Sequence, residues 1–121
     1  MLRCNIGEVY KVLGNPKWPF EGPFVEETVY VMCGYTYGRY ISLLSFHPVP
    51  NVSPTPEERF LVLRKDVLSL PRNIVGVVHR HPPNEEQPSI DDIEGIGSLL
   101  GAVWCEGQVT WYDRKGSREA I

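Results

Sequence analysis

The stretch IVGVVHRHPPNEEQPSIDDIEGI, residues 74–96, decides the expected fold of this chain. It opens with a continuous apolar run, IVGVV, which predicts a strand covered on both faces of a sheet. The run ends at His81-Pro82-Pro83, because proline cannot continue a central ladder. Ser89 then opens an expected helix. Its apolar residues recur at helical spacing: Ile90, Ile93, Ile96 and Leu100.

Two histidines leave the end of the predicted strand on one face. His79 and His81 are two residues apart, and side chains alternate across a strand. Their Cα atoms are therefore expected about 6–7 Å apart, which lets both imidazoles converge on one metal ion. Asp92 falls in the first turn of the helix, and the loop 82–88 can bring that turn back to the strand end. Two histidines and one carboxylate, with a water in the fourth position, are typical of catalytic zinc sites.

Each part of this stretch also has a purely structural interpretation. A His-x-His pair at a strand end can be two partly buried, hydrogen-bonded histidines. Ser89 and Asp92 match a helix capping box, with Ser89 as N-cap and Asp92 reaching back to its N–H. Asp91 is interpreted as a first-turn helix charge.

The complete string resembles the signature of the JAMM (MPN-plus) metalloproteases. It reads His-x-His-Pro, six residues, then Ser-x-x-Asp, and here runs from His79 to Asp92. The family also has a glutamate just before a strand that ends in glycine, and ETVYVMCG from Glu27 to Gly34 is similar to that segment. PVPNVSPTPEERF, residues 48–60, resembles the family's loop before its middle segment. The resemblance covers residues 25–115 in outline.

Three features of the chain bear on that resemblance. The family usually has an amphipathic helix before the glutamate strand, where GNPKWPFEGP at 14–23 is expected to be a loop. The residue between the histidines is usually small, and here it is Arg80, expected to point away from the ligands and to add positive charge at the rim. Glu26 and Glu27 point to opposite faces of a strand, and the distance to Gly34 favours Glu27 as the residue facing the metal.

The resemblance implies zinc-dependent hydrolysis of an amide bond. Zinc would be held by His79, His81 and Asp92. Glu27 would be the general base, and Ser89 would donate a hydrogen bond to the developing oxyanion. By resemblance to the compact prokaryotic members, the protein substrate would be a conjugate of a ubiquitin-like or sulfur-carrier β-grasp protein.

Other functions stay open at this point. A phage-tail or cell-wall type peptidase of the same superfamily would use the same residues. A non-catalytic MPN scaffold would only bind partners, although such proteins commonly lose metal ligands that this chain keeps. A metal-binding protein without peptidase activity is a third option. A homodimer through an exposed strand is also left open, and Tyr35 and Tyr37 are interpreted as a partner surface.

The rest of the chain predicts one α/β (α+β) domain over residues 1–121, a mixed β-sheet with flanking short helices, and the resemblance implies a cytidine-deaminase-like architecture. Strands are expected at 27–33 and 39–46 around a GYTYG turn, and two more within 102–116 around Glu106-Gly107. A short strand or helix fragment is expected at 8–13, a loop at 47–58, a strand start at 60–63, and a short helix stopped by Pro71.

Composition and charge argue against several classes. The formal net charge is −3 and no basic stripe is present, which disfavours nucleic acid and anionic membranes as partners. No apolar run approaches the roughly 20 residues of a membrane span, and the N-terminal MLRCNIGEVYKV has no signal-peptide core. An odd number of cysteines without a CxxC pair favours a reducing cytoplasm. Cys33 and Cys105 are interpreted as small buried hydrophobic residues, and Cys4 is left unassigned. Trp18, Trp104 and Trp111 are interpreted as core or interface aromatics, and His47 as exposed or locally bonded.

Overall fold

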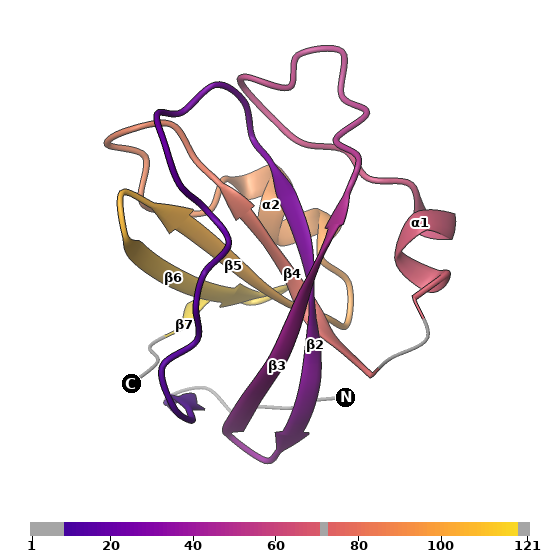
Figure 1. The fold of residues 1–121 in the computed structure, drawn as a ribbon, viewed down its shortest axis with the longest axis vertical. Coiled ribbons are helices and arrows are strands. Elements are labelled where there is room, and N and C mark those ends of the chain that lie inside the picture. The colour runs from indigo at the N-terminus through magenta and orange to yellow at the C-terminus, as the bar shows by residue number, and fades with distance from the viewer. Residues whose placement is uncertain (1–8, 71–72, 119–121) are drawn as a thin grey trace.

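The computed structural model describes residues 9–70 and 73–118, and the strands of this part form one mixed sheet (Figure 1). The strands are β1 (Lys11–Val12), β2 (Val29–Tyr37), β3 (Tyr40–Val49), β4 (Ile74–Arg80), β5 (Leu100–Cys105), β6 (Gln108–Asp113) and β7 (Gly116–Arg118), and the helices are α1 (Arg64–Leu68) and α2 (Ile90–Gly95). The strand order is β1-β3-β2-β4-β5-β6-β7. The expected mixed sheet with short helices is confirmed. In the described ranges, no helix has the length and apolar character needed to cross a membrane.

Strand β4 lies in the middle of the sheet and is covered on both faces, as its apolar run predicts. It pairs antiparallel with β2 and parallel with β5. Val77 belongs to the core cluster that includes α1 and residues around α2, whereas Val75 and Val78 belong to the cluster on the other face. The carboxyl end of β4 is therefore held between two neighbouring strands and two apolar layers.

The β2–β3 hairpin differs from the expected one at both ends. Strand β2 continues to Tyr37, so the turn is Gly38-Arg39 and the prediction of a GYTYG turn is wrong. Gly38 has a φ of 59°, which glycine adopts without steric cost in such two-residue turns. Strand β3 also continues through Pro48 to Val49, where a loop was expected. Pro48 is tolerated there because β1 pairs only with the other end of β3, which leaves this stretch at the edge of the sheet.

Two further expectations about local structure are wrong. Residues 60–63 form no strand, although Phe60 and Val62 pack against the core from an irregular segment. Leu100 does not continue the helix: α2 ends at Gly95, and Leu100 is the first residue of β5. The expected helix before Pro71 is present as α1. Pro71, Cys4 and the start of the 8–13 segment lie outside the described residues.

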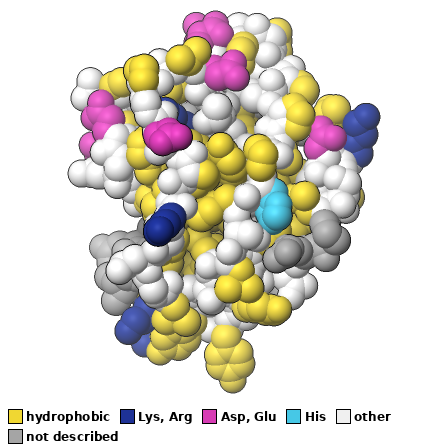
Figure 2. Space-filling view, viewed as in Figure 1, with side chains coloured by type: hydrophobic (Ala, Val, Ile, Leu, Met, Phe, Trp, Pro, Cys, Tyr) yellow, Lys and Arg dark blue, Asp and Glu magenta, His cyan; other side chains and the backbone are white. Residues whose placement is uncertain are grey.

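The face of the sheet away from α1 and α2 is covered by an extended segment, residues 14–24, which we name the strap (Figure 1). Hydrophobic side chains gather in the middle of this face of the molecule (Figure 2). Trp18 and Phe20 of the strap each contact two rings of the sheet, with centroid distances of 5.1–6.0 Å. The partners come from four strands: Phe46, Trp111, Tyr30 and Trp104. The expected loop at 14–23 is confirmed, and aromatic packing holds it on the sheet.

Arg80 fastens the strap to the end of β4. Its guanidinium donates hydrogen bonds to the carbonyls of Glu21 and Gly22, at 3.1 and 2.6 Å, and lies 5.0 Å from the centroid of the Trp104 ring. It points away from the two histidines, as expected. Instead of adding free positive charge at the rim, it binds the strap.

We predict that Arg80→Ala lowers the free energy of unfolding by about 1–2 kcal/mol, because two hydrogen bonds to carbonyls and a cation–π contact are lost. Urea unfolding measures the change. Arg64→Ala is the matched control, since Arg64 is exposed on α1. Equal stability losses in the two variants would contradict the assigned role of Arg80.

Candidate metal centre

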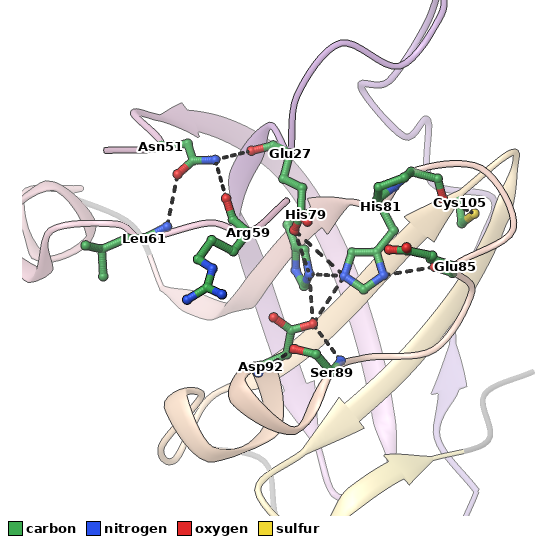
Figure 3. Close-up of polar contacts among 11 residues, drawn as sticks. Glu27, Asn51, Arg59, Leu61, His79, His81, Glu85, Ser89, Asp92 and Cys105 are labelled. Atoms are coloured by element: carbon green, nitrogen blue, oxygen red, sulfur yellow. Dashed lines mark hydrogen bonds and ion pairs between the residues drawn. The ribbon is translucent and has the colours of Figure 1, made fainter. Parts of the chain in front are cut away.

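Two histidine side chains meet at the carboxyl end of β4 (Figure 3). His79 lies in β4 and His81 follows one residue after its end, and their Nε2 atoms lie 2.8 Å apart. Both residues are buried, with exposed fractions of 0% and 6%. The alternation of side chains along an extended chain therefore places both rings on one face, as predicted.

Asp92 reaches the same point from α2. Its Oδ2 atom lies 3.2 Å from the Nε2 atom of each histidine. The same oxygen accepts a hydrogen bond from the backbone N–H of Ser89 at 2.9 Å, while Ser89 Oγ accepts from the N–H of Asp92 at 3.0 Å. The capping box is thus formed, and its carboxylate faces the histidines. The structural interpretation and the site interpretation of this motif are compatible, and Asp91 is exposed beside it.

Glu27 approaches from the segment just before β2. Its Oε1 atom lies 3.8 Å from both Nε2 atoms, and the residue is 2% exposed. Glu26 is exposed, so Glu27 is the glutamate that faces the histidines. The pairing of Val29 with His79 across β2 and β4 brings the start of one strand beside the end of the other.

The surroundings of the His81 ring determine which of its two nitrogens carries the hydrogen. Its Nδ1 lies 2.9 Å from the carbonyl oxygen of Glu85. A carbonyl only accepts, so Nδ1 carries the hydrogen, and neutral His81 presents a lone pair at Nε2. The His79 ring packs against Phe60 at a centroid distance of 4.2 Å, and its Nδ1 is buried without a hydrogen-bond partner in residues 9–70 and 73–118.

Burial and charge move the pKa values of these groups in different directions. Burial, helped by the nearby charges of Asp92 and Glu85, raises the pKa of Glu27 to about 7. Burial lowers the pKa of His79. It would also lower the pKa of His81, but the hydrogen bonds to Asp92 and to the Glu85 carbonyl outweigh it and raise that pKa. Burial opposes ionisation of Asp92 as well, but hydrogen bonds from both histidines hold its pKa well below the ordinary value.

These side chains form a group that could hold a metal ion. Ligand atoms of Glu27, His79 and His81 all lie within 4.8 Å of one another. Asp92 Oδ2 lies closer to both histidines than Glu27 does. Ligands about 2.0–2.1 Å from a tetrahedral zinc ion stand about 3.3 Å from one another. The separations of 2.8, 3.2 and 3.2 Å among His79, His81 and Asp92 are close to that geometry.

Several residues around this group were missed by sequence reasoning. Tyr112 in β6 places its ring edge-on to His79 at 6.3 Å, and its hydroxyl is buried with no hydrogen-bond partner in the described chain. Burial and the charges of Asp92 and Glu27 raise the pKa of that hydroxyl. Nothing in the local sequence signals this contact. Phe60 and Asn51 lie in the 48–60 stretch, whose resemblance was noted without assigning them a role. His47 lies outside the group and contacts Ser45 Oγ at 2.9 Å, a local bond as expected.

The fold is similar to solved structures of low sequence identity. Protein DSY2949 from Desulfitobacterium hafniense, known from a solution structure, matches with a TM-score of 0.62 and 18% identity, covering 79% of this chain and 77% of that protein. AF2198, a JAB1/MPN domain protein from Archaeoglobus fulgidus, matches at 19% identity over 79% of each chain, with a TM-score of 0.47 that is too low to carry an argument. No protein-family model and no curated protein matches the sequence. The likeness to DSY2949 supports the fold alone.

The raised pKa of Glu27 predicts how the stability of the metal-free protein depends on pH. The folded state keeps the Glu27 proton up to about pH 7, whereas the unfolded chain releases it near the ordinary value of 4.5. The contribution of Glu27 to stability is therefore lost as pH rises between these values. We predict that Glu27→Gln stabilises the protein more at about pH 7.5 than at about pH 5, in urea unfolding with a chelator present.

The neighbouring Glu26→Gln serves as the control, because Glu26 is exposed. A Glu27→Gln effect that is the same at both pH values, or no larger than the effect of Glu26→Gln, would contradict this prediction.

Proposed function

We propose that this chain is a zinc-dependent hydrolase of amide bonds, an isopeptidase or peptidase. One observation carries the proposal: the motif residues at the end of β4 and at the start of α2 meet a buried glutamate from the start of β2 (Figure 3). These residues are His79, His81, Asp92 and Glu27. Glu27 is distant in sequence from the other three, and all four are residues to which the JAMM resemblance assigns roles.

The zinc ion would be held by His79 and His81 through Nε2 and by Asp92 through Oδ2. Two imidazoles and one carboxylate leave a coordination position open, as catalytic zinc sites do. Because His81 Nδ1 keeps its hydrogen on the Glu85 carbonyl, the proton released on metal binding would be the one at Nε2, which leaves a lone pair there for zinc. Asp92 is already in the ionised form that zinc requires. When bound, the ion would polarise the scissile carbonyl and lower the pKa of a water molecule.

Glu27 would act as the general base. Its Oε1 atom is farther from each histidine Nε2 than Asp92 Oδ2 is, at 3.8 Å against 3.2 Å, which suits a group that stands beside the ligands. From there the carboxylate would take a proton from the attacking water and deliver it to the leaving amine. The positive charge of a bound zinc ion would favour the ionised carboxylate, the form that a general base requires.

Ser89 would stabilise the oxyanion. Its Oγ atom accepts a hydrogen bond from the N–H of Asp92, so the hydroxyl hydrogen stays available for another acceptor. A hydrogen bond from this hydroxyl to the developing oxyanion would be stronger in the transition state than in the ground state. The N-cap and the oxyanion donor would then be the same side chain.

The substrate class in this proposal follows from the sequence resemblance. It is a protein conjugate of a ubiquitin-like or sulfur-carrier β-grasp protein. The bond cleaved would join the C-terminal glycine carboxyl of that protein to an amine. A cytoplasmic location is part of the same proposal.

We predict about one zinc per purified wild-type chain and near-complete loss of zinc in Asp92→Ala at the same metal concentration. Asp92 would supply one of only three protein ligands, so its removal leaves an incomplete set. Elemental analysis after dialysis measures the content. Asp91→Ala is the matched control because Asp91 is the exposed neighbour. A wild-type protein that takes up no zinc at neutral pH would contradict the proposed zinc site. Ser89 and Asp92 would then serve only as a helix cap.

We predict that Glu27→Gln lowers turnover about 10²–10⁴-fold while zinc stays bound, because the variant loses the base but keeps the ligands. The assay uses a panel of β-grasp domains fused through their C-terminal glycines to a reporter. Glu26→Gln is expected to retain wild-type turnover. Full activity of Glu27→Gln would reject the base, and a zinc-loaded wild type that cleaves no member of the panel would favour a non-catalytic scaffold.

A further inference from the structure

The side chain of Asn51 connects the proposed base to the segment that follows β3 (Figure 3). Its Nδ2 atom donates to the carbonyl of Glu27 at 2.8 Å and to the carbonyl of Arg59 at 3.1 Å. Its Oδ1 atom accepts from the N–H groups of Ser53 and Leu61, at 3.1 and 3.0 Å. An asparagine amide has two donor hydrogens and two acceptor lone pairs, so all of its hydrogen-bonding capacity is used.

The backbone of Glu27 is held from both sides by the segment 51–61. Its N–H donates to the carbonyl of Pro56 at 2.7 Å, and its carbonyl accepts from Asn51. Glu27 lies two residues before the first residue of β2, and both of its backbone groups bind outside the sheet. The position of the Glu27 carboxylate therefore depends on this segment as well as on the strand that follows.

The same amide also fixes the ring that packs on His79. Asn51 binds the residues on either side of Phe60, the carbonyl of Arg59 and the N–H of Leu61. The backbone N–H of Val52 donates to the carbonyl of Leu61 at 2.8 Å, which joins the two ends of the segment. Phe60 then packs against His79, with the ring centroids 4.2 Å apart and the planes tilted by 34°. Asn51 thus also holds the chain on both sides of Phe60, while the position of His79 itself is set by the pairing of β4 with β2 and β5.

The three proposed zinc ligands are supported by other elements. His79 lies in β4, His81 directly follows that strand and Asp92 lies in α2. None of the hydrogen bonds of Asn51 reaches these three residues. Glu27 alone among the proposed site residues binds Asn51 directly. Removal of Asn51 is therefore expected to disturb the position of Glu27 while the protein still binds the metal ion.

We propose that Asn51 is a positioning residue of this site, which holds the Glu27 carboxylate against the two histidines by clamping its peptide to the segment 51–61. This inference rests on the proposed function for its effect on turnover. Its structural content, the clamp on Glu27, can be tested without turnover.

The test compares Asn51→Ala and Asn51→Asp with Ser53→Ala. Asn51→Asp keeps the shape and the acceptors but loses both donors, whereas Ser53→Ala removes one hydrogen bond within the same segment, from the N–H of Thr55 to Ser53 Oγ, and leaves Glu27 untouched. For both Asn51 variants we expect kcat to fall about 10- to 100-fold, KM to stay within about threefold and zinc content to stay at about one per chain. Ser53→Ala is expected to lower Tm with turnover within about twofold of wild type.

Amide hydrogen exchange by NMR supplies the second measurement. In the Asn51 variants the Glu27 amide is expected to exchange at least about tenfold faster than in wild type, while the amides of β4 keep their protection. Unchanged Glu27 exchange, turnover losses that follow Tm equally in all three variants, or loss of zinc together with turnover would each overturn the inference. A wild type without zinc or turnover would refute the proposed function, and the exchange measurement would still decide the role of Asn51.

Discussion

Two imidazole nitrogens 2.8 Å apart, beside the carboxylates of Asp92 and Glu27, are the arrangement on which the rest of this structure depends. In a buried place, two ring nitrogens at that distance require a shared proton or a cation between them, because two lone pairs directed at each other repel. Asp92 supplies negative charge that favours either. Burial keeps the charged form of Glu27 costly and holds that group near its titration point at neutral pH.

Three parts of the fold place these side chains: strand β4, the loop after His81 and the first turn of α2. Strand β4 is central and apolar on both faces, so its end is fixed by packing. The loop after His81 returns the chain to α2, and the carbonyl of Glu85 in that loop sets the His81 proton on the way. The first turn of α2 is fixed by its capping box, and that box presents Asp92 to the histidines. The local structure of each of these parts therefore orients the side chain that it contributes to the site.

The sequence predicts the elements that carry the two histidines and Asp92, because these elements follow local patterns. Contacts between segments far apart in the chain have no such local pattern. The apolar run before His79, the two-residue spacing of the histidines and the capping box are local patterns, so they predicted β4, α2 and the meeting of His79, His81 and Asp92. Glu27 required the family resemblance, because its approach depends on strand pairing across β2 and β4.

The roles of Asn51, Phe60 and Tyr112 depend on which distant segments touch, and no local period encodes such contacts. The extension of β3 through Pro48 also depends on sheet position, since proline is tolerated there because that stretch lies at an edge.

The capping box has a thermodynamic consequence for α2. A helix of six residues is too short to persist by its own hydrogen bonds, so its first turn relies on the reciprocal contacts of Ser89 and Asp92. The Asp92 oxygen that closes this turn is the same atom that faces both histidines. Any ligand that draws on that oxygen is therefore linked to the folding equilibrium of α2. By reciprocity, a change that frays α2 and moves Asp92 also changes the affinity of the centre for its ligand.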